Sequence, residues 1–483
     1  MRRFASFLNR FALVSILSVQ APSFAADAEA NVQDSASAQL EQTKPNVKSL
    51  DNFGNPQLVE VEKLTNSILR AEIQMMRYST SLHATWVRPS RCKSWRVFAY
   101  KMTGSTMLNV GMSLIAGSRF QYMNNPPAAS RPYLKSGHIV NMTAASILLG
   151  GTLFEAVLDK RAENRHAKKH LDLKSAVQTF LDMQNQLDGS LAKRNSLAEN
   201  CPGLSPSQKE ILRVDGLVLR DLRDLSVSEF QYSFSDIARL RSARDAATWT
   251  TAFGAATAAY GGSLQSLLSV ADREPKQVGV AGIGFMTSGS SVIAAPMLIH
   301  WAGHHARFRA RAKLESAGVT SRVIAAENFD AHRKELAELI ARADSSEKQL
   351  LQALDARKTV YDLQNELLDA REETREAIDR HIKKEYHERM FYSTVVGGAQ
   401  VARGAQLAVA GFKYFDDATK SYPLVAAAST TYIAGSGVWT LDNIQGKLRE
   451  EIARRRATTT SVHAKLLEDM DDLENMDDQM SIF

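Results

Sequence analysis

Few residue clusters in this chain could carry out chemistry. His300 and His304 stand four residues apart and would share one face of a helix, which is the spacing of two metal ligands. No nearby carboxylate or cysteine supplies the third and fourth ligands that a zinc site needs, so we expect no metal there. A basic flank beside an interface explains these histidines better.

Two other segments resemble known sites without their spacing. The acidic residues between Glu468 and Asp478 lack the glycine and the ligand order of an EF-hand loop. The glycines of 279–284 lie inside an apolar stretch instead of following a strand, which argues against a phosphate loop. The sequence also lacks a nucleophile elbow and a His-Glu-x-x-His motif. We therefore expect neither an enzyme nor a cofactor.

The two cysteines, Cys92 and Cys201, could form a disulfide in an exported protein. If the stretch between the first apolar hairpin and Cys201 is one helix, it separates the two by about 60 Å. A disulfide needs α-carbons within about 7 Å. A bond would therefore require a long helix before Cys92 to fold alongside, or a contact between subunits, and the sequence leaves the pairing open.

The elements that carry these residues are six apolar stretches arranged as three hairpins. The hairpins begin at residues 98, 246 and 389, so they recur about every 145 residues, as in a repeat architecture. No segment alternates apolar and polar residues in the rhythm of a strand. We predict an all-α fold in which three apolar helical hairpins are linked by long antiparallel coiled-coil helices.

This pattern divides the chain into nine segments. A signal peptide is expected first, then a flexible leader, an N-terminal helix, and three apolar hairpins that alternate with two coiled-coil hairpins. An amphipathic acidic helix ends the chain. In that order, the predicted ranges are 1–25, 26–57, 58–97, 98–158, 159–245, 246–303, 304–388, 389–445 and 446–483.

Each apolar arm is long enough to cross a membrane, because 20 to 26 helical residues span roughly 30–39 Å. Aromatic residues stand near the arm ends, as in the interfacial belts of membrane proteins; large core residues near helix ends are the alternative. Arg403 lies near the middle of the fifth arm and should face an interior, a lumen or another subunit. The predicted interface residues are Trp95, Trp249, Trp301, Trp439, Tyr122, Tyr260 and Tyr422.

The arms are rich in Gly, Ala, Ser and Thr, which lets helix backbones approach closely. Basic residues gather at the open ends of the hairpins, where they could bind anionic lipid headgroups. An ordinary solvated helix face is the alternative for any one cluster. The predicted headgroup residues are Arg96, Arg161, Arg165, Arg244, Arg307, Arg389 and Arg449.

The first 25 residues have the basic start, short apolar core and small-residue cleavage site of a signal peptide. Its removal lowers the formal net charge from +6 to +3, which gives little support for binding nucleic acid. After cleavage the open ends would face the periplasm, where basic flanks do not suit an inner-membrane protein. We therefore expect insertion into the outer membrane from its inner leaflet.

A signal peptide, three small-residue hairpins and intervening coiled coils together resemble the PopA-like α-helical outer-membrane proteins of predatory bacteria. The resemblance covers nearly the whole mature chain but rests on architecture, without a diagnostic motif. It implies a homo-oligomeric ring, a pentamer, that encloses lipid instead of an open aqueous channel.

The functional hypothesis is an outer-membrane protein whose homo-oligomer forms a ring around lipid or a pore. A soluble periplasmic scaffold or tether is the second hypothesis, in which the apolar hairpins would be a buried core. A secreted helical pore-forming protein is the third. The expected partners are membrane lipid and further copies of the chain.

Overall fold

The computed structural model describes residues 56–87, 91–124, 131–168, 173–271, 274, 276–319, 325–342 and 348–455. The predicted signal peptide, nearly all of the leader and the acidic cluster near the C-terminus lie outside these residues. Throughout the described chain every regular element is a helix, which confirms the all-α prediction. Most of them are far longer than the usual three turns.

The helices in chain order begin with α3, and a π-helical stretch, η2, joins α7 to α8. Their bounds are α3 Pro56–Val87, α4 Arg91–Asn124, α5 Arg131–Lys168, α6 Leu173–Glu199, α7 Pro206–Thr248, η2 Trp249–Ala256, α8 Thr257–Ala271, α9 Lys276–Ser316, α10 Ala325–Arg342, α11 Lys348–Phe412 and α12 Ala418–Arg455.

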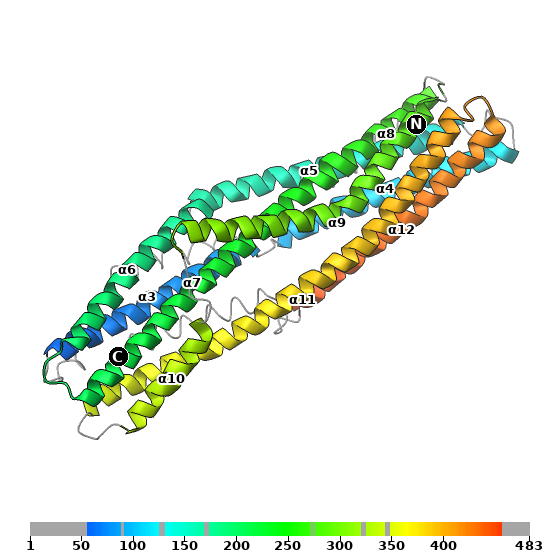
Figure 1. The fold of residues 1–483 in the computed structure, drawn as a ribbon. Helices are drawn as coiled ribbons and strands as arrows, with labels where there is room; N and C mark the ends of the chain where they lie inside the picture. The colour runs from blue at the N-terminus through cyan, green and yellow to red at the C-terminus, as the bar shows by residue number, and fades with distance from the viewer. Residues whose placement is uncertain are drawn as a thin grey trace.

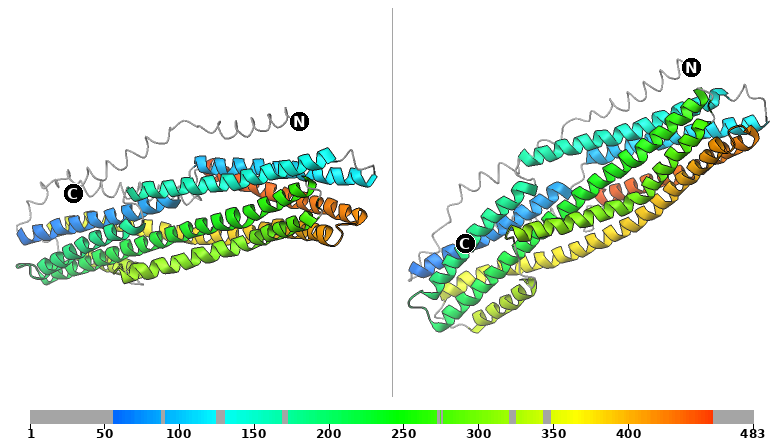
Figure 2. Two further views of the ribbon diagram at one scale, coloured as in Figure 1. Left: turned by 90° about the horizontal axis from the view of Figure 1, so that it is seen from above. Right: turned by 45° about the horizontal axis from the view of Figure 1, so that its top comes forward.

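The molecule is a long rod made of two helix bundles end to end (Figures 1 and 2). We call one the charged bundle, which contains α3, α6, α10, the N-terminal parts of α7 and α11 and the C-terminal end of α9. The other, the apolar bundle, contains α4, α5, η2, α8, the rest of α9, α12 and the C-terminal part of α11. The boundaries predicted at residues 245 and 388 fall inside continuous helical paths, because α7 runs through η2 into α8 and α11 passes from one bundle to the other.

Local sequence explains the turn at the far end of the charged bundle. Gly203 has a φ of 80°, which a residue with a side chain rarely adopts. Ser205 then caps α7: its hydroxyl accepts from the Gln208 backbone, and the Gln208 side chain accepts from the Ser205 backbone. Pro206 occupies the first turn, where its missing N–H costs nothing.

The six arms of the apolar bundle form a closed circuit. Each helix packs on the next in the order α4, α5, α8, α9, α11 and α12, and α12 packs back on α4. Each bundle has its own hydrophobic cluster. That of the charged bundle includes Ile68, Phe180 and Phe230, and that of the apolar bundle includes Met112, Phe285 and Tyr432.

Candidate membrane-binding surface

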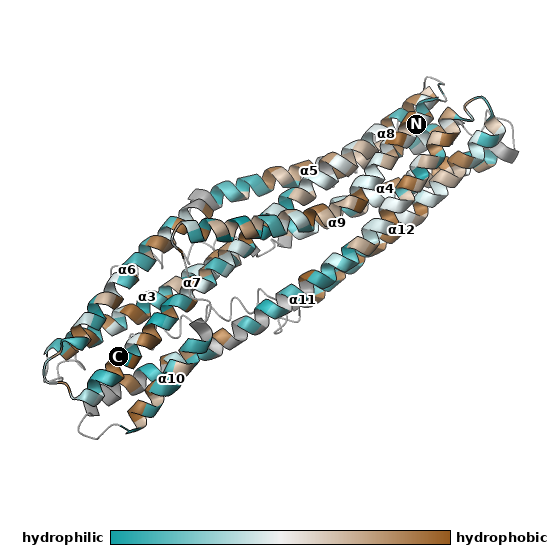
Figure 3. Cartoon of the chain, viewed as in Figure 1, coloured by the Kyte–Doolittle hydropathy of each residue, from teal (hydrophilic) through white to brown (hydrophobic). Residues whose placement is uncertain are grey.

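Large apolar side chains are exposed on one half of the rod only. Among the side chains described, the exposed ones lie on α4, α5, η2, α9, the C-terminal part of α11 and α12, and none lies on α3, α6, α7 or α10. Figure 3 shows more brown and white along the apolar bundle and more teal along α10 and the adjoining part of α11. Exposed apolar area on this scale marks a surface for lipid or for another protein.

One group of exposed aromatic residues encircles the apolar bundle near its junction with the charged bundle. We call these residues the collar. Their exposed fractions run from 45% for Trp95 to 65% for Trp301. The collar consists of Trp95, Phe154, Trp249, Trp301 and Phe391.

Contacts between neighbouring helices fix the level of the collar. Lys447 Nζ of α12 lies 4.6 Å from the centre of the Trp95 ring on α4. Arg96 Nε, on the next residue, donates to Glu155 Oε1 of α5 at 2.8 Å. Further contacts at this level join α11 to α12 (the Tyr392 hydroxyl to Gln445 Oε1, 3.2 Å) and α9 to α11 (the His300 and Tyr386 ring centres, 4.7 Å). The collar therefore lies within about two helical turns along the rod.

A second aromatic group lies at the hairpin tips. Phe120 and Tyr133 are 50% and 53% exposed. At the same end, the Arg119 guanidinium lies 4.4 Å from the centre of the Tyr422 ring. From Trp95 to Phe120 helix α4 covers about 37 Å, which fits a hydrocarbon core of about 30 Å with aromatic residues at both interfaces.

The predicted interface residues do not all lie at these two levels. Trp95, Trp249 and Trp301 are collar residues, and Tyr422 lies at the tips. Tyr260 does not lie at a tip, because α8 continues for about three further turns.

Two predicted interface residues remain. Trp439 is half-buried in α12, and the side chain of Tyr122 lies outside the described residues. Sequence reasoning also missed Phe154, Phe308 and Phe391, which are more exposed than Trp95. Each of these phenylalanines stands near charged residues at the end of an apolar arm, and this position could have identified them from the sequence.

Several of the predicted headgroup arginines are paired within the chain. Arg96 bonds Glu155 and Arg449 bonds Glu388, with N–O distances of 2.8 and 2.6 Å. Arg389 pairs with Glu385. These carboxylates offset the positive charge that would attract an anionic headgroup.

The other four headgroup candidates differ in exposure. Arg161 and Arg165 are exposed on α5, whereas Arg244 and Arg307 are half-buried. The Arg307 guanidinium lies 5.7 Å from the centre of the Tyr232 ring. Arg161 and Arg165 therefore have the geometry best suited to a phosphate at the membrane surface.

Glycines bring α9 and α11 into backbone contact within the chain. A methyl group added to Gly397 would lie 2.7 Å from the Gly289 carbonyl oxygen, and one added to Gly289 would lie 2.6 Å from that of Gly397. Two further antiparallel pairs repeat the contact, Gly282 with Gly404 and Gly279 with Gly411. The predicted close approach through small residues therefore occurs between arms of one subunit.

Arg403 lies inside the apolar bundle and is only 4% exposed. Its Cζ atom is 3.6 Å from the centre of the Phe285 ring and 4.6 Å from that of Tyr432. One turn earlier on α11, Gln400 Nε2 donates to Ser288 Oγ of α9 at 2.9 Å. The inside of this bundle thus holds polar groups beside its hydrophobic cluster, and further large apolar side chains face outward.

The disulfide left open between Cys92 and Cys201 does not form in this chain. Both cysteines are free; Cys92 is exposed and Cys201 is buried. Cys92 begins α4 at the junction of the bundles, whereas Cys201 lies in the turn before α7, at the far end of the charged bundle. The length of α7 keeps them about 60 Å apart, far beyond disulfide range.

The charged bundle holds an ion network that the sequence analysis did not find. Asp215 of α7 accepts from Arg194 at 2.6 Å, from Arg357 at 3.0 Å and from the Tyr361 hydroxyl at 2.9 Å. Arg357 also donates to Glu62 at 3.1 Å. All five side chains are at most 3% exposed, and they join α3, α6, α7 and α11.

Burial shifts the acid–base properties of this network. Desolvation raises the pKa of Tyr361 and, against the opposing charge of Arg357, that of Glu62. Glu72 lies ten residues after Glu62 on α3. Its pKa is well above its usual range because it is buried and lies near the negative Asp215. Neither carboxyl oxygen of Glu72 has a hydrogen-bond partner, so nothing in the described residues offsets the burial that favours its neutral form.

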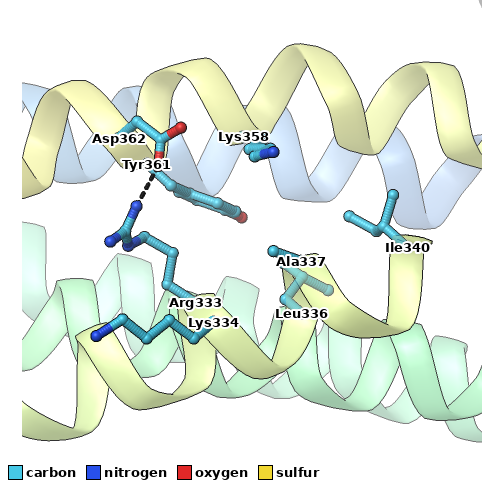
Figure 4. Close-up of a pocket in the computed structure, with 8 residues that line it drawn as sticks. All are labelled: Arg333, Lys334, Leu336, Ala337, Ile340, Lys358, Tyr361 and Asp362. Atoms are coloured by element: carbon cyan, nitrogen blue, oxygen red, sulfur yellow. Dashed lines mark hydrogen bonds and ion pairs between the residues drawn. The ribbon is translucent and has the colours of Figure 1, made fainter. Parts of the chain in front are cut away.

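A cleft lies between α10 and α11 in the charged bundle (Figure 4). Arg333 reaches across it to Asp362, and both Arg333 and Lys334 also pair with Asp330. These charges are therefore engaged within the chain. Among the described residues, no group of three or more His, Cys, Asp or Glu side chains could hold a metal ion.

Two helices of the described chain are long and apolar enough to cross a membrane, namely Pro132–Arg165 and Lys276–Ser316. Only 22% and 39% of their apolar windows are buried, whereas the core helix of a soluble protein would be mostly buried. The chain matches no family model, no curated protein and no solved structure.

Proposed function

We propose that this chain is a non-enzymatic outer-membrane protein whose apolar bundle inserts into the bilayer while its charged bundle stays in water. The carrying observation is that the exposed large apolar side chains of the described residues lie on the helices of the apolar bundle, most of them between the collar and the hairpin tips. Moving that apolar surface from water into lipid is favourable, whereas leaving it exposed to water is not. The polar interior, with Arg403 away from the outer face, fits the same arrangement.

The orientation follows from the two ends of the apolar bundle. All three tips lie at the free end of the rod, and all connections to the charged bundle lie at the collar. The hairpins would therefore enter from one side, without translocating the charged bundle. With the predicted signal peptide removed, that side is the periplasm and the membrane is the outer one.

Assembly into a homo-oligomeric ring around lipid or a pore is the second part of the proposal. It rests on the resemblance to PopA-like proteins and on the exposed apolar faces, which adjacent subunits could share with lipid. Because the six arms already close a circuit within one chain, subunits would meet along outer helix faces. A ring of such subunits would enclose the lipid or the pore at its centre, between subunits and not within any one of them.

Flotation with phospholipid vesicles tests insertion. A variant with Phe154→Ser, Trp301→Ser and Phe391→Ser should lose at least about tenfold in vesicle-bound fraction, since burying each such side chain contributes roughly 1.5–3 kcal/mol. The matched control replaces the same three residues with leucine and should still bind. Wild-type protein that stays monomeric in water without detergent and ignores vesicles would overturn the proposal.

One observation favours the soluble scaffold instead. Of the six arms in the described chain, only those in α5 and α9 reach the hydropathy of a membrane span. Carbonate extraction of cell membranes separates the two functions. A scaffold would be released into the soluble fraction, whereas an inserted protein would remain and would fractionate with the outer membrane.

A further inference from the structure

The six arms of the apolar bundle contain positive groups and no negative ones. Lys101, Arg119, His138 and Arg403 all lie within their lengths. No Asp or Glu occurs in 91–124, 131–154, 246–271, 276–314, 389–412 or 418–441. Within these ranges the bundle therefore has no carboxylate to balance a buried cation, and Glu155 and Asp442, which directly follow two of them, lie at its junction end.

We propose that Arg403 is the centre of a binding site for a small monovalent anion, a property that goes beyond the proposed membrane insertion. The guanidinium is 4% exposed, and among the described residues it forms no ion pair. An arginine stays charged in a protein interior, and an uncompensated buried charge is strongly unfavourable. A bound anion would remove that penalty.

The aromatic neighbours of Arg403 do not replace an anion. Phe285 and Tyr432 lie over the guanidinium at 3.6 and 4.6 Å from their ring centres. Such cation–π contacts use the faces of the guanidinium and contribute up to about 2 kcal/mol. The five N–H groups point outward in the guanidinium plane, where an anion can accept from them.

One further polar side chain, on α5, lies near Arg403. His138 is 8% exposed, and the charges that act on it are those of Arg119 and Arg403, both positive. An anion bound beside Arg403 would also offset these two like charges.

The burial of Arg403 selects the class of ligand. Because this residue is only 4% exposed among packed helices, we take the ligand to be a small inorganic ion such as chloride or nitrate. The competing occupant is a carboxylate from another subunit, which would require Arg403 to be accessible from outside the bundle. The same experiment distinguishes the two.

Line broadening of ³⁵Cl in nuclear magnetic resonance measures chloride binding to the detergent-extracted full chain. We expect excess broadening that nitrate removes and gluconate does not, and a loss of at least tenfold in affinity in Arg403→Gln. Arg220→Gln, which changes an exposed arginine of α7 in the charged bundle, should bind chloride like the wild type. Circular dichroism checks that each variant is folded.

If Arg403→Gln does not fold, Arg403→Lys keeps the charge but loses the planar donors, so chloride should bind several-fold more weakly. The proposal is overturned if the wild type shows no excess broadening. It is also overturned if the folded Arg403 variant binds chloride as the wild type does. Insertion into vesicles is measured separately, so failure of this site leaves the membrane proposal intact.

Discussion

The two bundles of this chain solve the packing of long helices in opposite ways. In the charged bundle, Phe180, Phe230 and other large apolar side chains fill the centre, and the stacked rings of these two lie 3.9 Å apart. In the apolar bundle, Gly289 and Gly397 let α9 and α11 touch through their backbones, while large apolar side chains face outward. A single polypeptide thus carries one bundle suited to water and one suited to lipid.

If the apolar bundle inserts as proposed, different forces hold the two halves together. Burial of large side chains draws on the hydrophobic effect, which requires water outside. Lipid tails offer no such driving force between helices, so a bundle in the bilayer depends on close van der Waals contact and interhelical hydrogen bonds. The glycine pairs and the Gln400–Ser288 bond supply both kinds of contact in the apolar bundle.

The largest expected effect tests the centre of the charged bundle. Asp215→Ala leaves Arg194 and Arg357 buried without their shared carboxylate, which should cost about 3–5 kcal/mol. Peptide-resolved hydrogen exchange should show lost protection in α3 and α7 but not in α8 or α12. Equal loss in both bundles would mean that they unfold as one unit, and the comparison between them would fail.

The control for Asp215 is a carboxylate on the surface of the same helix. Glu210 pairs with Arg213 three residues later, and both side chains are about half exposed. Glu210→Ala should cost no more than about 0.5 kcal/mol, because exposed pairs are weak. A large loss of stability in Glu210→Ala would show that any substitution in α7 destabilises the protein, whether or not it removes the buried network.

Adjacent glycines give the matched test for the apolar bundle. Gly397 faces Gly289 and Ile293 of α9, whereas a side chain at Gly398 would meet nothing within 4 Å. Gly397→Leu should therefore separate α9 from α11 and cost about 1–3 kcal/mol through overpacking. Gly398→Leu should be neutral, or slightly stabilising because leucine favours helix.

Thermal unfolding in detergent, followed by circular dichroism, measures both variants. Equal losses of stability for the two would mean that α11 tolerates neither residue for reasons of helix geometry. Equal neutrality would mean that the two arms are not in backbone contact. Either outcome would remove the contrast between side-chain and backbone packing.

Local signals in the sequence predicted the helices and part of the surface. The apolar runs, and tryptophans such as Trp249 and Trp301, mark the arms and the collar because they depend on residues close in the chain. The network of Asp215 was not predictable in this way, since Arg357 lies 142 residues away and Glu62 lies 295 residues from Arg357. Such pairings depend on how helices far apart in the chain come together.

The same limit applies to the interior of the apolar bundle. The sequence predicted that Arg403 avoids lipid, but its contact with Phe285 required the register between α9 and α11. Likewise, the pairing of Arg96 with Glu155 depends on how α4 packs on α5. This pairing makes Arg96 less able to bind a lipid headgroup. Tyr260 was placed at a tip because the length of α8 was not known.

The smallest expected effect concerns Glu72. This carboxylic acid is buried in the charged bundle, so it tests whether that bundle excludes water from its centre. Its pKa in the folded state is raised well above the ordinary value of 4.5 by burial. Below pH 4.5 both states hold the proton, so its contribution to stability is complete. As the pH rises above 4.5 the unfolded chain releases the proton while the folded chain keeps it, so stability falls until the folded pKa is reached.

Glu72→Gln has no proton to release and should lack this loss. The variant should gain stability over the wild type as the pH rises from 4 to 8, with little difference at pH 4, where both side chains are neutral. Hydrogen exchange of α3 at several pH values measures the effect, and α8 serves as the internal reference. A stability difference that does not change with pH would show that Glu72 ionises in the folded protein as it does in water, with a partner for its charge inside the charged bundle.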